Sequence, residues 1–200
     1  MVLGSTQERA VLSPAAVAHL GAQVVRRRGG GGAVLLMPGD HLWIDAWIPR
    51  DDPLWHDDVS HAALWAGQWW SDALEAVGIG GTVVHSGRAQ SGRYPAICFS
   101  GRGPGEVVAP SGAKIMGLSQ WRSREGALFH TCAYTHFDAA PLVGLIALSD
   151  TDRVTWREAL DGTAVGVEDL TRGSATLAGL SQRLSSTFGD WATTPAAPRV

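Results

Sequence analysis

Alternating apolar and polar residues dominate the middle of the chain. In residues 41–48, every second residue is apolar, from Leu42 to Ile48, which is the pattern of a half-buried strand. Short apolar runs bounded by Gly, Pro and Ser predict further strands at residues 1–7, 24–28, 33–36, 82–86, 95–100, 106–110, 113–117 and 127–134. Because short turns connect most of these runs, we expect a mainly antiparallel sheet.

In other parts of the chain, apolar residues recur at the spacing of an α-helix. Residues 57–77 begin with aspartates, contain no proline and end at Gly78, so they form the best predicted helix. A shorter helix is expected after Ser13-Pro14, closed by Gly21, with others at residues 139–148, 150–160 and 174–188. Strands and helices fall in separate runs, which predicts an α+β domain over residues 1–190 and a loose tail at residues 191–200.

Composition narrows the class of protein. The chain has 200 residues, a formal net charge of −3 and 45% hydrophobic residues, which fits one globular domain and disfavours a general nucleic-acid surface. No apolar run is long enough for a membrane span and no leader pattern follows Met1, so we expect a soluble, cytoplasmic protein with no membrane contact. Two cysteines and seven histidines show no metal-ligand spacing, which predicts no protein metal site.

The first candidate for chemistry is a basic, glycine-rich segment, Arg26-Arg27-Arg28-Gly29-Gly30-Gly31-Gly32-Ala33-Val34. Glycines let the backbone approach a ligand, and consecutive amides with neighbouring guanidinium groups can bind a phosphate or carboxylate. The alternative is a flexible glycine hairpin with solvated arginines.

The second candidate surrounds the only lysine of the chain. Lys114 lies in the run Gly112-Ala113-Lys114-Ile115-Met116-Gly117-Leu118-Ser119-Gln120-Trp121-Arg122, where glycines on both sides leave room for a ligand. An ammonium there could offset charge on a reacting phosphate, as acyl activation by ATP requires. A solvated lysine on an edge strand is the alternative.

Cys98 is the third candidate, because it ends an apolar run followed by Phe99. A cysteine in that position can be a nucleophile, but it is more often a small buried hydrophobic residue.

The order and separation of the first two motifs resemble the lipoate-protein ligase branch of the biotin/lipoate ligase superfamily, which is also related to the octanoyltransferases. That family carries Arg-Arg-x-Ser-Gly-Gly-Gly-Ala-Val and, later, Gly-x-Lys-Val/Ile-x-Gly-Ser-Ala-Gln-x-Arg. The resemblance covers about residues 2–150 and includes Leu3-Gly4-Ser5-Thr6-Gln7. It implies a largely antiparallel mixed sheet packed with helices, as in the ligase catalytic domain.

The resemblance also implies an activity. A ligase of this kind uses ATP to convert lipoate, or octanoate, to the acyl-AMP and transfers the acyl group to a lysine of a lipoyl carrier domain. The carrier would be a 2-oxoacid dehydrogenase E2 component or the glycine cleavage H protein. Magnesium would accompany ATP, with no tightly bound cofactor. The residues implied to hold the acyl-adenylate or ATP are Arg26, Arg27, Gly30, Gly31, Gly32, Ala33, Val34, Lys114, Gly117, Ser119 and Gln120, with Lys114 as the catalytic residue.

Three alternatives stay open. In octanoyltransferases that resemble these ligases, a cysteine in a Cys-Phe context takes the acyl group from acyl carrier protein without ATP, and Cys98 falls near that position. The family's histidines are replaced by Leu36 and by Thr131-Cys132, and the chain begins without the family's upstream strand and helix, so a late start or a truncated relative is expected. A non-catalytic homologue that binds the acyl group or the carrier domain therefore remains possible, and biotin transfer is a minor alternative.

Overall fold

The structure, a computed structural model, describes residues 1–193. Its strands are β1 (Val2–Leu3), β2 (Val25–Arg26), β3 (His41–Pro49), β4 (Val83–Val84), β5 (Val107–Val108), β6 (Lys114–Arg122) and β7 (Gly126–Tyr134). Its α-helices are α1 (Pro14–Leu20), α2 (Val59–Ala76), α3 (Ala140–Leu145), α4 (Asp150–Leu160), α5 (Val167–Thr171) and α6 (Leu177–Thr193), and short 3₁₀ turns lie at Arg9–Val11 and Cys98–Ser100.

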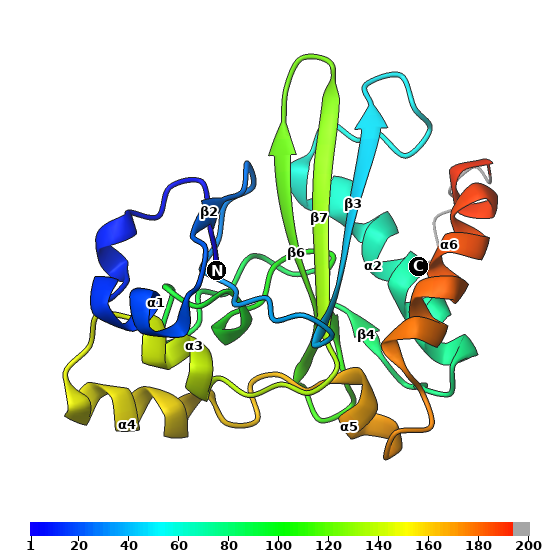
Figure 1. Ribbon diagram of the computed structural model, residues 1–200. Helices are drawn as coiled ribbons and strands as arrows, with labels where there is room; N and C mark the ends of the chain where they lie inside the picture. The colour runs from blue at the N-terminus through cyan, green and yellow to red at the C-terminus, as the bar shows by residue number, and fades with distance from the viewer. Residues whose placement is uncertain (194–200) are drawn as a thin grey trace.

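The centre of the molecule is a five-stranded sheet with the order β3-β7-β6-β5-β4, in which every neighbouring pair is antiparallel. The three long strands β3, β7 and β6 stand side by side in Figure 1. A separate two-stranded parallel sheet, β1-β2, lies near the N-terminus. The predicted α+β class with a largely antiparallel mixed sheet is therefore confirmed.

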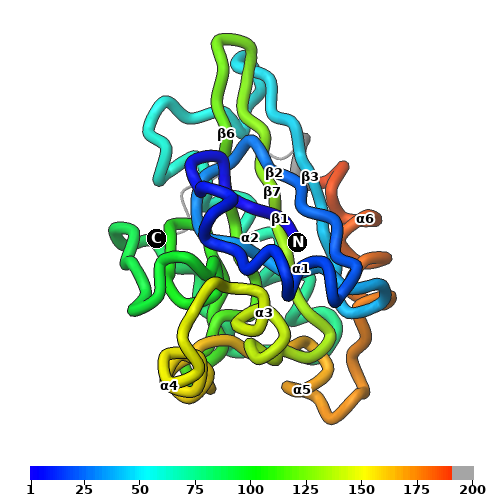
Figure 2. The backbone as a smooth tube through the Cα atoms, turned by 60° about the vertical axis from the view of Figure 1, so that its left-hand side comes forward, coloured from blue at the N-terminus to red at the C-terminus, as the bar shows by residue number. Residues whose placement is uncertain are grey.

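The two faces of the central sheet are covered by different layers. Helices α2 and α6 cover one face, and the N-terminal segment with β1, β2, α1, α3 and α4 lies on the other side (Figure 1). The α2 side holds the largest apolar core, in which the ring of Trp65 meets Phe129 edge-on and Trp70 is fully buried. The tube in Figure 2, turned toward the N-terminal side, shows β1 and β2 in front of β7. The N-terminal segment thus lies on the face of the sheet opposite to α2 and α6.

The helix ends follow the sequence signals. Asp58 accepts a hydrogen bond from the amide of His61 at the start of α2, Ser13 does the same for Ala16 at the start of α1, and Gly21 ends α1 in a left-handed conformation. No helix within residues 1–193 combines the length and apolar character required to cross a membrane.

Several boundaries differ from the sequence prediction. Residues 95–100 do not form a strand; they form a loop that curls into one 3₁₀ turn, because the Ser100 hydroxyl donates to the carbonyls of Tyr94 and Ile97. The strand expected at 113–117 continues to Arg122, and the short helix α5 was not predicted. Of the expected loose tail, helix α6 takes in residues up to Thr193, and residues 194–200 lie outside the described part of the chain.

Candidate functional site

A small cavity lies between the glycine-rich segment and the face of the central sheet opposite to α2 and α6. Its volume is about 10 Å³, which is room for about one water molecule. Its lining includes Arg27, Cys98, Phe99, Gly117, Ser119 and His130. The structure therefore brings together residues of the glycine motif, the lysine motif and the Cys98 segment, which are far apart in the sequence.

Arg27 connects the glycine-rich loop to the sheet. Its Nε donates to Ser119 Oγ at 3.1 Å, and its Nη2 donates to the carbonyls of Gly30 and Gly32 at 2.6 and 2.8 Å. The side chain is buried, and Nη1 is buried with no hydrogen-bond partner. A guanidinium group that is held by three hydrogen bonds and keeps one nitrogen, with two N–H donors, unpaired at a cavity is suited to binding an anion.

The loop itself is closely packed on one side and open on the other. A Cβ on Gly32 would lie 2.5 Å from the amide nitrogen of Cys98, whereas a Cβ on Gly30 would meet nothing within 4 Å. Gly31 has a φ of 92°, which favours glycine. Beyond the loop, Ala33 and Val34 are buried and pair with residues of the N-terminal layer and the Cys98 segment.

Two residues of the predicted set lie apart from the cavity. Arg26 is exposed, and its Nη1 donates to the carbonyls of Gly4, Ser5 and Gln7. Gln120 pairs with Phe129, so its side chain lies on the α2 side of the sheet, opposite to Ser119.

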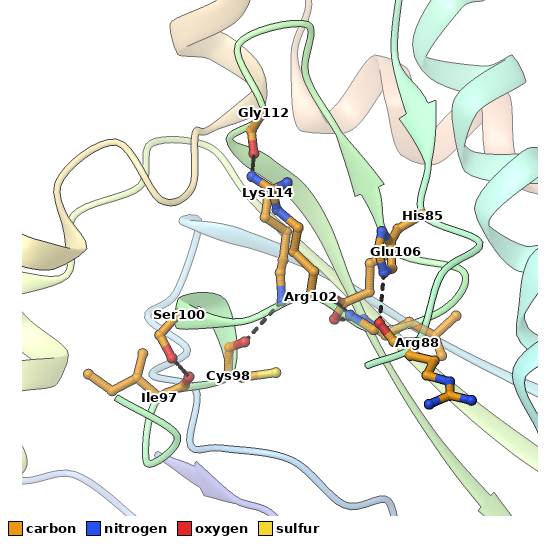
Figure 3. Close-up of polar contacts among 11 residues, drawn as sticks. His85, Arg88, Ile97, Cys98, Ser100, Arg102, Glu106, Gly112 and Lys114 are labelled. Carbon is orange, nitrogen blue, oxygen red and sulfur yellow. Dashed lines mark hydrogen bonds and ion pairs between the residues drawn. The ribbon is translucent and has the colours of Figure 1, made fainter. Parts of the chain in front are cut away.

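Lys114 is almost fully buried and has an acidic partner that the sequence analysis missed. Its Nζ lies 2.7 Å from Glu106 Oε2 and donates to the main-chain carbonyl of Cys98 at 2.9 Å (Figure 3). The ammonium also lies over the ring of Phe99, 5.2 Å from its centroid. Glu106 in turn accepts hydrogen bonds from the amides of Gly103 and Leu118. In the sequence, Glu106 is the one acidic residue of the otherwise apolar run 106–110, and this was the signal that could have identified it as a partner.

A β-bulge directs Lys114 toward the cavity side of the sheet. Val107 pairs with Met116 but Val108 pairs with Lys114, so β6 contains one extra residue at this point. Ile115 and Met116 consequently both face the α2 core, and the alternation restarts with Gly117 on the cavity side. Lys114 therefore shares a face with Gly117 and Ser119.

At Gly117, a side chain packs so closely against the lysine motif that it leaves little room for a Cβ atom. A Cβ at this position would lie 3.1 Å from the ring of Phe99. The absence of a side chain lets this ring, which also contacts Lys114, lie flat against the sheet.

Cys98 lines the cavity with its thiol while its carbonyl oxygen accepts from Lys114, and Figure 3 shows the sulfur pointing away from that carbonyl. Burial raises the pKa of the Cys98 thiol, and the nearby positive charge of Lys114 only partly opposes this effect. Cys132, on β7, lines the same cavity, and burial likewise raises the pKa of its thiol. Both cysteines are free thiols.

His130 and Asp45 form a further pair that sequence reasoning did not select. His130 Nδ1 lies 2.7 Å from Asp45 Oδ1, and the Trp43 indole donates to the same oxygen at 2.6 Å. The histidine side chain is buried, and its Nε2 has no partner. Their positions on the polar sides of two adjacent strands were the only sequence signal.

A larger cavity of about 430 Å³ lies beside the site, between α4 and the segment after β7. Its lining includes three carboxylates, from Asp138, Glu158 and Asp161, and one guanidinium, from Arg157. Ala164 forms part of its wall, and the neighbouring main chain pairs with that of Lys114. Within residues 1–193, no group of three or more His, Cys, Asp or Glu side chains is placed to hold a metal ion.

A family model described as "Lipoyl protein ligase A/B catalytic domain" matches residues 1–189. No curated protein matches the sequence.

Solved structures with the same fold include three lipoate ligases. The bipartite lipoate protein ligase of Thermoplasma acidophilum, described with its E2 lipoyl domain, has a TM-score of 0.69 at 18% identity, over 95% of this chain and 66% of that one. A lipoate-protein ligase A bound with ATP has a TM-score of 0.67 at 16% identity, over 95% and 67%. P. falciparum LipL1 in complex with lipoate has a TM-score of 0.62 at 13% identity, over 95% of this chain and 46% of that one. The chain thus spans about two thirds or less of these relatives.

Proposed function

The chain belongs to the lipoyl protein ligase A/B catalytic domain family, and we propose that it is a lipoate-protein ligase. In this proposal it joins lipoate, or octanoate, to AMP at the expense of ATP. It then transfers the acyl group to a lysine of a lipoyl carrier domain, from an E2 component or an H protein.

The observation that carries this proposal is the free Nη1 of Arg27. The other donors of this guanidinium are held by Ser119, Gly30 and Gly32, so the group is fixed before a ligand arrives. A buried donor without a partner is costly unless a ligand satisfies it. The carboxylate of the acyl substrate, or the phosphate of its adenylate, supplies the matching acceptor.

Lys114 supplies the second positive charge. In the first step, a carboxylate oxygen of the substrate attacks the α-phosphorus of ATP and pyrophosphate leaves with the electron pair of the broken P–O bond. An ammonium beside the acyl phosphate stabilises the charge that develops there. Glu106, whose Oε2 lies 2.7 Å from Lys114 Nζ, holds this side chain in position within a buried site.

The ATP phosphates belong at the glycine-rich loop in this proposal. The larger neighbouring cavity has a suitable size, but three of its four charged lining residues are carboxylates, which repel a triphosphate. The loop offers Arg27 and the open backbone at Gly30. Mg²⁺ would reach the site on the phosphates, held mainly by them and by water.

The acyl chain requires the small cavity to open. A volume of about 10 Å³ holds one water molecule, so the ring of Phe99 or Trp43 has to move to admit a medium-chain acyl group. Both rings border the cavity, and such a movement would break the hydrogen bond of Trp43 to Asp45 or the contact of Phe99 with the Lys114 ammonium.

The test is intact mass spectrometry of an apo lipoyl domain incubated with the protein, lipoate and ATP. We expect a mass gain that requires ATP, and the variant Arg27→Gln should lose it. The control Arg153→Gln removes an arginine that binds three main-chain carbonyls outside the cavity, and it should retain the gain. Failure of the wild-type protein to modify any lipoyl domain while it binds lipoyl-AMP would support the binding homologue instead.

A thioester route through Cys98 is the second candidate, because the Cys98 thiol lines the same cavity as Arg27. Here the thiolate would accept octanoyl from acyl carrier protein and pass it to the target lysine without ATP. Burial raises the pKa of this thiol, so the route requires a base to deprotonate it. Octanoyl carrier protein as donor, with Cys98→Ser against the control Cys132→Ser, separates this route from the ligase.

A further inference from the structure

The pair formed by His130 and Asp45 has no part in the adenylation step described above. Both ring nitrogens of His130 are buried, in a site where most polar atoms are paired. Nδ1 faces Asp45 Oδ1 at 2.7 Å, on the adjacent strand β3. A carboxylate only accepts hydrogen bonds, so Nδ1 carries the proton in this contact. In the tautomer that this contact selects, Nε2 carries the lone pair.

The basic nitrogen faces the cavity. The Nδ1 edge of the ring points to Asp45, and the opposite edge lies under the glycine-rich loop, where a Cβ on Gly29 would be 3.3 Å from His130 Cδ2. His130 lines the cavity together with Arg27 and Ser119. Nε2 has no partner among the described residues, although it is buried. An unpartnered buried base beside the proposed acyl-phosphate position is placed to accept a proton there.

Asp45 gives the pair access to the surface. Its side chain is 50% exposed, while that of His130 is 8% exposed. The carboxylate is oriented by the Trp43 indole, which donates to it at 2.6 Å. The pair therefore joins a half-exposed carboxylate on β3 to a buried ring that lines the cavity.

From this geometry we propose that His130 is the base that deprotonates the target lysine of the carrier domain, with Asp45 as its positioning residue. The inference rests on the proposed ligase function and concerns its second step. A lysine reaches the site as an ammonium, which has no free electron pair and cannot attack the acyl carbon.

The step balances in atoms and charge. His130 Nε2 takes one proton from the lysine ammonium, and the amine nitrogen forms a bond to the acyl carbon. The bond between that carbon and the phosphate oxygen breaks, and AMP leaves with its electron pair. The amide nitrogen loses its second proton to water, and Asp45 stabilises the imidazolium until it is deprotonated.

The charged and titratable groups around His130 come from four segments of the chain. Asp45 faces it from β3, and Arg27 lines the same cavity after β2. The thiols of Cys98 and of Cys132 on β7 also line this cavity, and burial raises the pKa of both, so they stay neutral. Asp45 is thus the carboxylate in direct contact with the ring.

The experiment starts from synthetic lipoyl-AMP, so that it does not depend on adenylation by the protein. Single-turnover transfer to an apo lipoyl domain is followed by intact mass for the wild type, His130→Gln and Asp45→Asn. We expect transfer to slow by about 10²–10⁴-fold in His130→Gln, and by a smaller factor in Asp45→Asn. Lipoate-dependent pyrophosphate exchange, which reports adenylation, should stay near the wild-type rate in both.

Two readouts separate a proton-accepting role from a structural one. The acidic limb of the wild-type pH profile should disappear in His130→Gln, and added imidazole should restore transfer in His130→Ala. The matched control is His136→Gln, because His136 also pairs with an aspartate, Asp169, but on an exposed surface.

Each outcome of these experiments either supports or overturns the proposed role of His130. Slow transfer from lipoyl-AMP in His130→Gln with normal exchange supports it. If the wild type shows no exchange but transfers from lipoyl-AMP, only the proposed first step is refuted, and slow transfer in His130→Gln, with loss of the acidic limb, still supports the inference. Wild-type transfer in His130→Gln overturns it, and so does an equal loss of transfer and exchange. A wild-type protein that cannot use lipoyl-AMP overturns it as well.

Discussion

The ammonium of Lys114 and the carboxylate of Glu106 form a buried ion pair at 2.7 Å, with side chains 1% and 4% exposed. Removal of one partner leaves the other charge uncompensated in a site of low dielectric constant, which costs about 3–5 kcal/mol. We therefore expect Lys114→Met to lower the free energy of unfolding by that amount, as measured by urea denaturation.

The double variant Lys114→Met/Glu106→Gln is the control for this prediction. It removes both charges and should recover most of the lost stability, while acyl-AMP formation stays absent. If the single variant is as stable as the wild type, the two groups do not form this ion pair.

Arg27 should bind the acyl-adenylate through the planar set of N–H donors of its guanidinium group, which lysine lacks. Its guanidinium bonds to Ser119, Gly30 and Gly32 and keeps Nη1 free, whereas a lysine ammonium is a point charge. A charge-assisted hydrogen bond contributes about 1.5–3 kcal/mol, so Arg27→Lys should weaken binding of a non-hydrolysable acyl-AMP analogue by roughly 10–100-fold. Calorimetric titration measures the Kd. An unchanged Kd would remove Arg27 from the binding site, and Arg153→Lys serves as the matched control.

Gly32 should not tolerate even one methyl group. A Cβ there would meet the backbone of Cys98 and Ile97 at 2.5 Å, and such overpacking costs about 1–3 kcal/mol. Gly32→Ala should therefore lower the thermal midpoint, whereas Gly30→Ala, with nothing within 4 Å, should change stability by less than about 0.5 kcal/mol. Differential scanning calorimetry compares the two, and equal midpoints would contradict the packing of this loop.

The exposed pair of His136 and Asp169 should contribute a pH-dependent part of the stability. The hydrogen bond that His136 donates to the Asp169 carboxylate raises the pKa of His136 above 6.5. Burial opposes ionisation of Asp169, but hydrogen bonds from His136 and two amides outweigh it and lower the pKa of this carboxyl below 3.8. A raised histidine pKa stabilises the fold below pH 6.5, and that stability is lost as pH rises through the folded value. A lowered aspartate pKa stabilises it above pH 3.8, and that stability is lost as pH falls through the folded value.

The stabilising window of this pair thus lies between about pH 3.8 and 6.5. The difference in thermal midpoint between wild type and His136→Gln should be largest there and should shrink toward pH 8. A difference that is constant across this range would show that the pair contributes no pH-dependent stability.

The sequence predicted the large elements because each has its own local signal. The alternation in residues 41–48 and the capped apolar spacing of residues 57–77 are periodic patterns that tertiary contacts reinforce. Residues 95–100 were misassigned as a strand because their apolar composition is that of a strand, while the Ser100 hydroxyl bonds that curl the chain depend on the fold.

The residues of the candidate site could be predicted from the sequence only in part. The glycine and lysine motifs are local in sequence, so Arg27, Ser119 and Lys114 could be selected. The partners of these residues could not, because Glu106 meets Lys114 only through the bulged pairing of β5 with β6, and His130 meets Asp45 only across the register of β3 with β7. Gln120 and Ser119 are adjacent in the motif but lie on opposite faces, which a linear motif does not distinguish.

The β-bulge in β6 shifts the alternation of side chains between the two faces of the sheet within the lysine motif. Two consecutive residues, Ile115 and Met116, enter the α2 core, and this one-residue offset is what leaves Lys114 on the cavity side. Without the bulge, regular alternation backward from Gly117 would place Ile115 on the cavity side and turn Lys114 into the apolar core, while Gly117 and Ser119 kept their places. The irregular pairing of β5 with β6, and not only the identity of the motif residues, therefore determines which side of the sheet receives the ammonium.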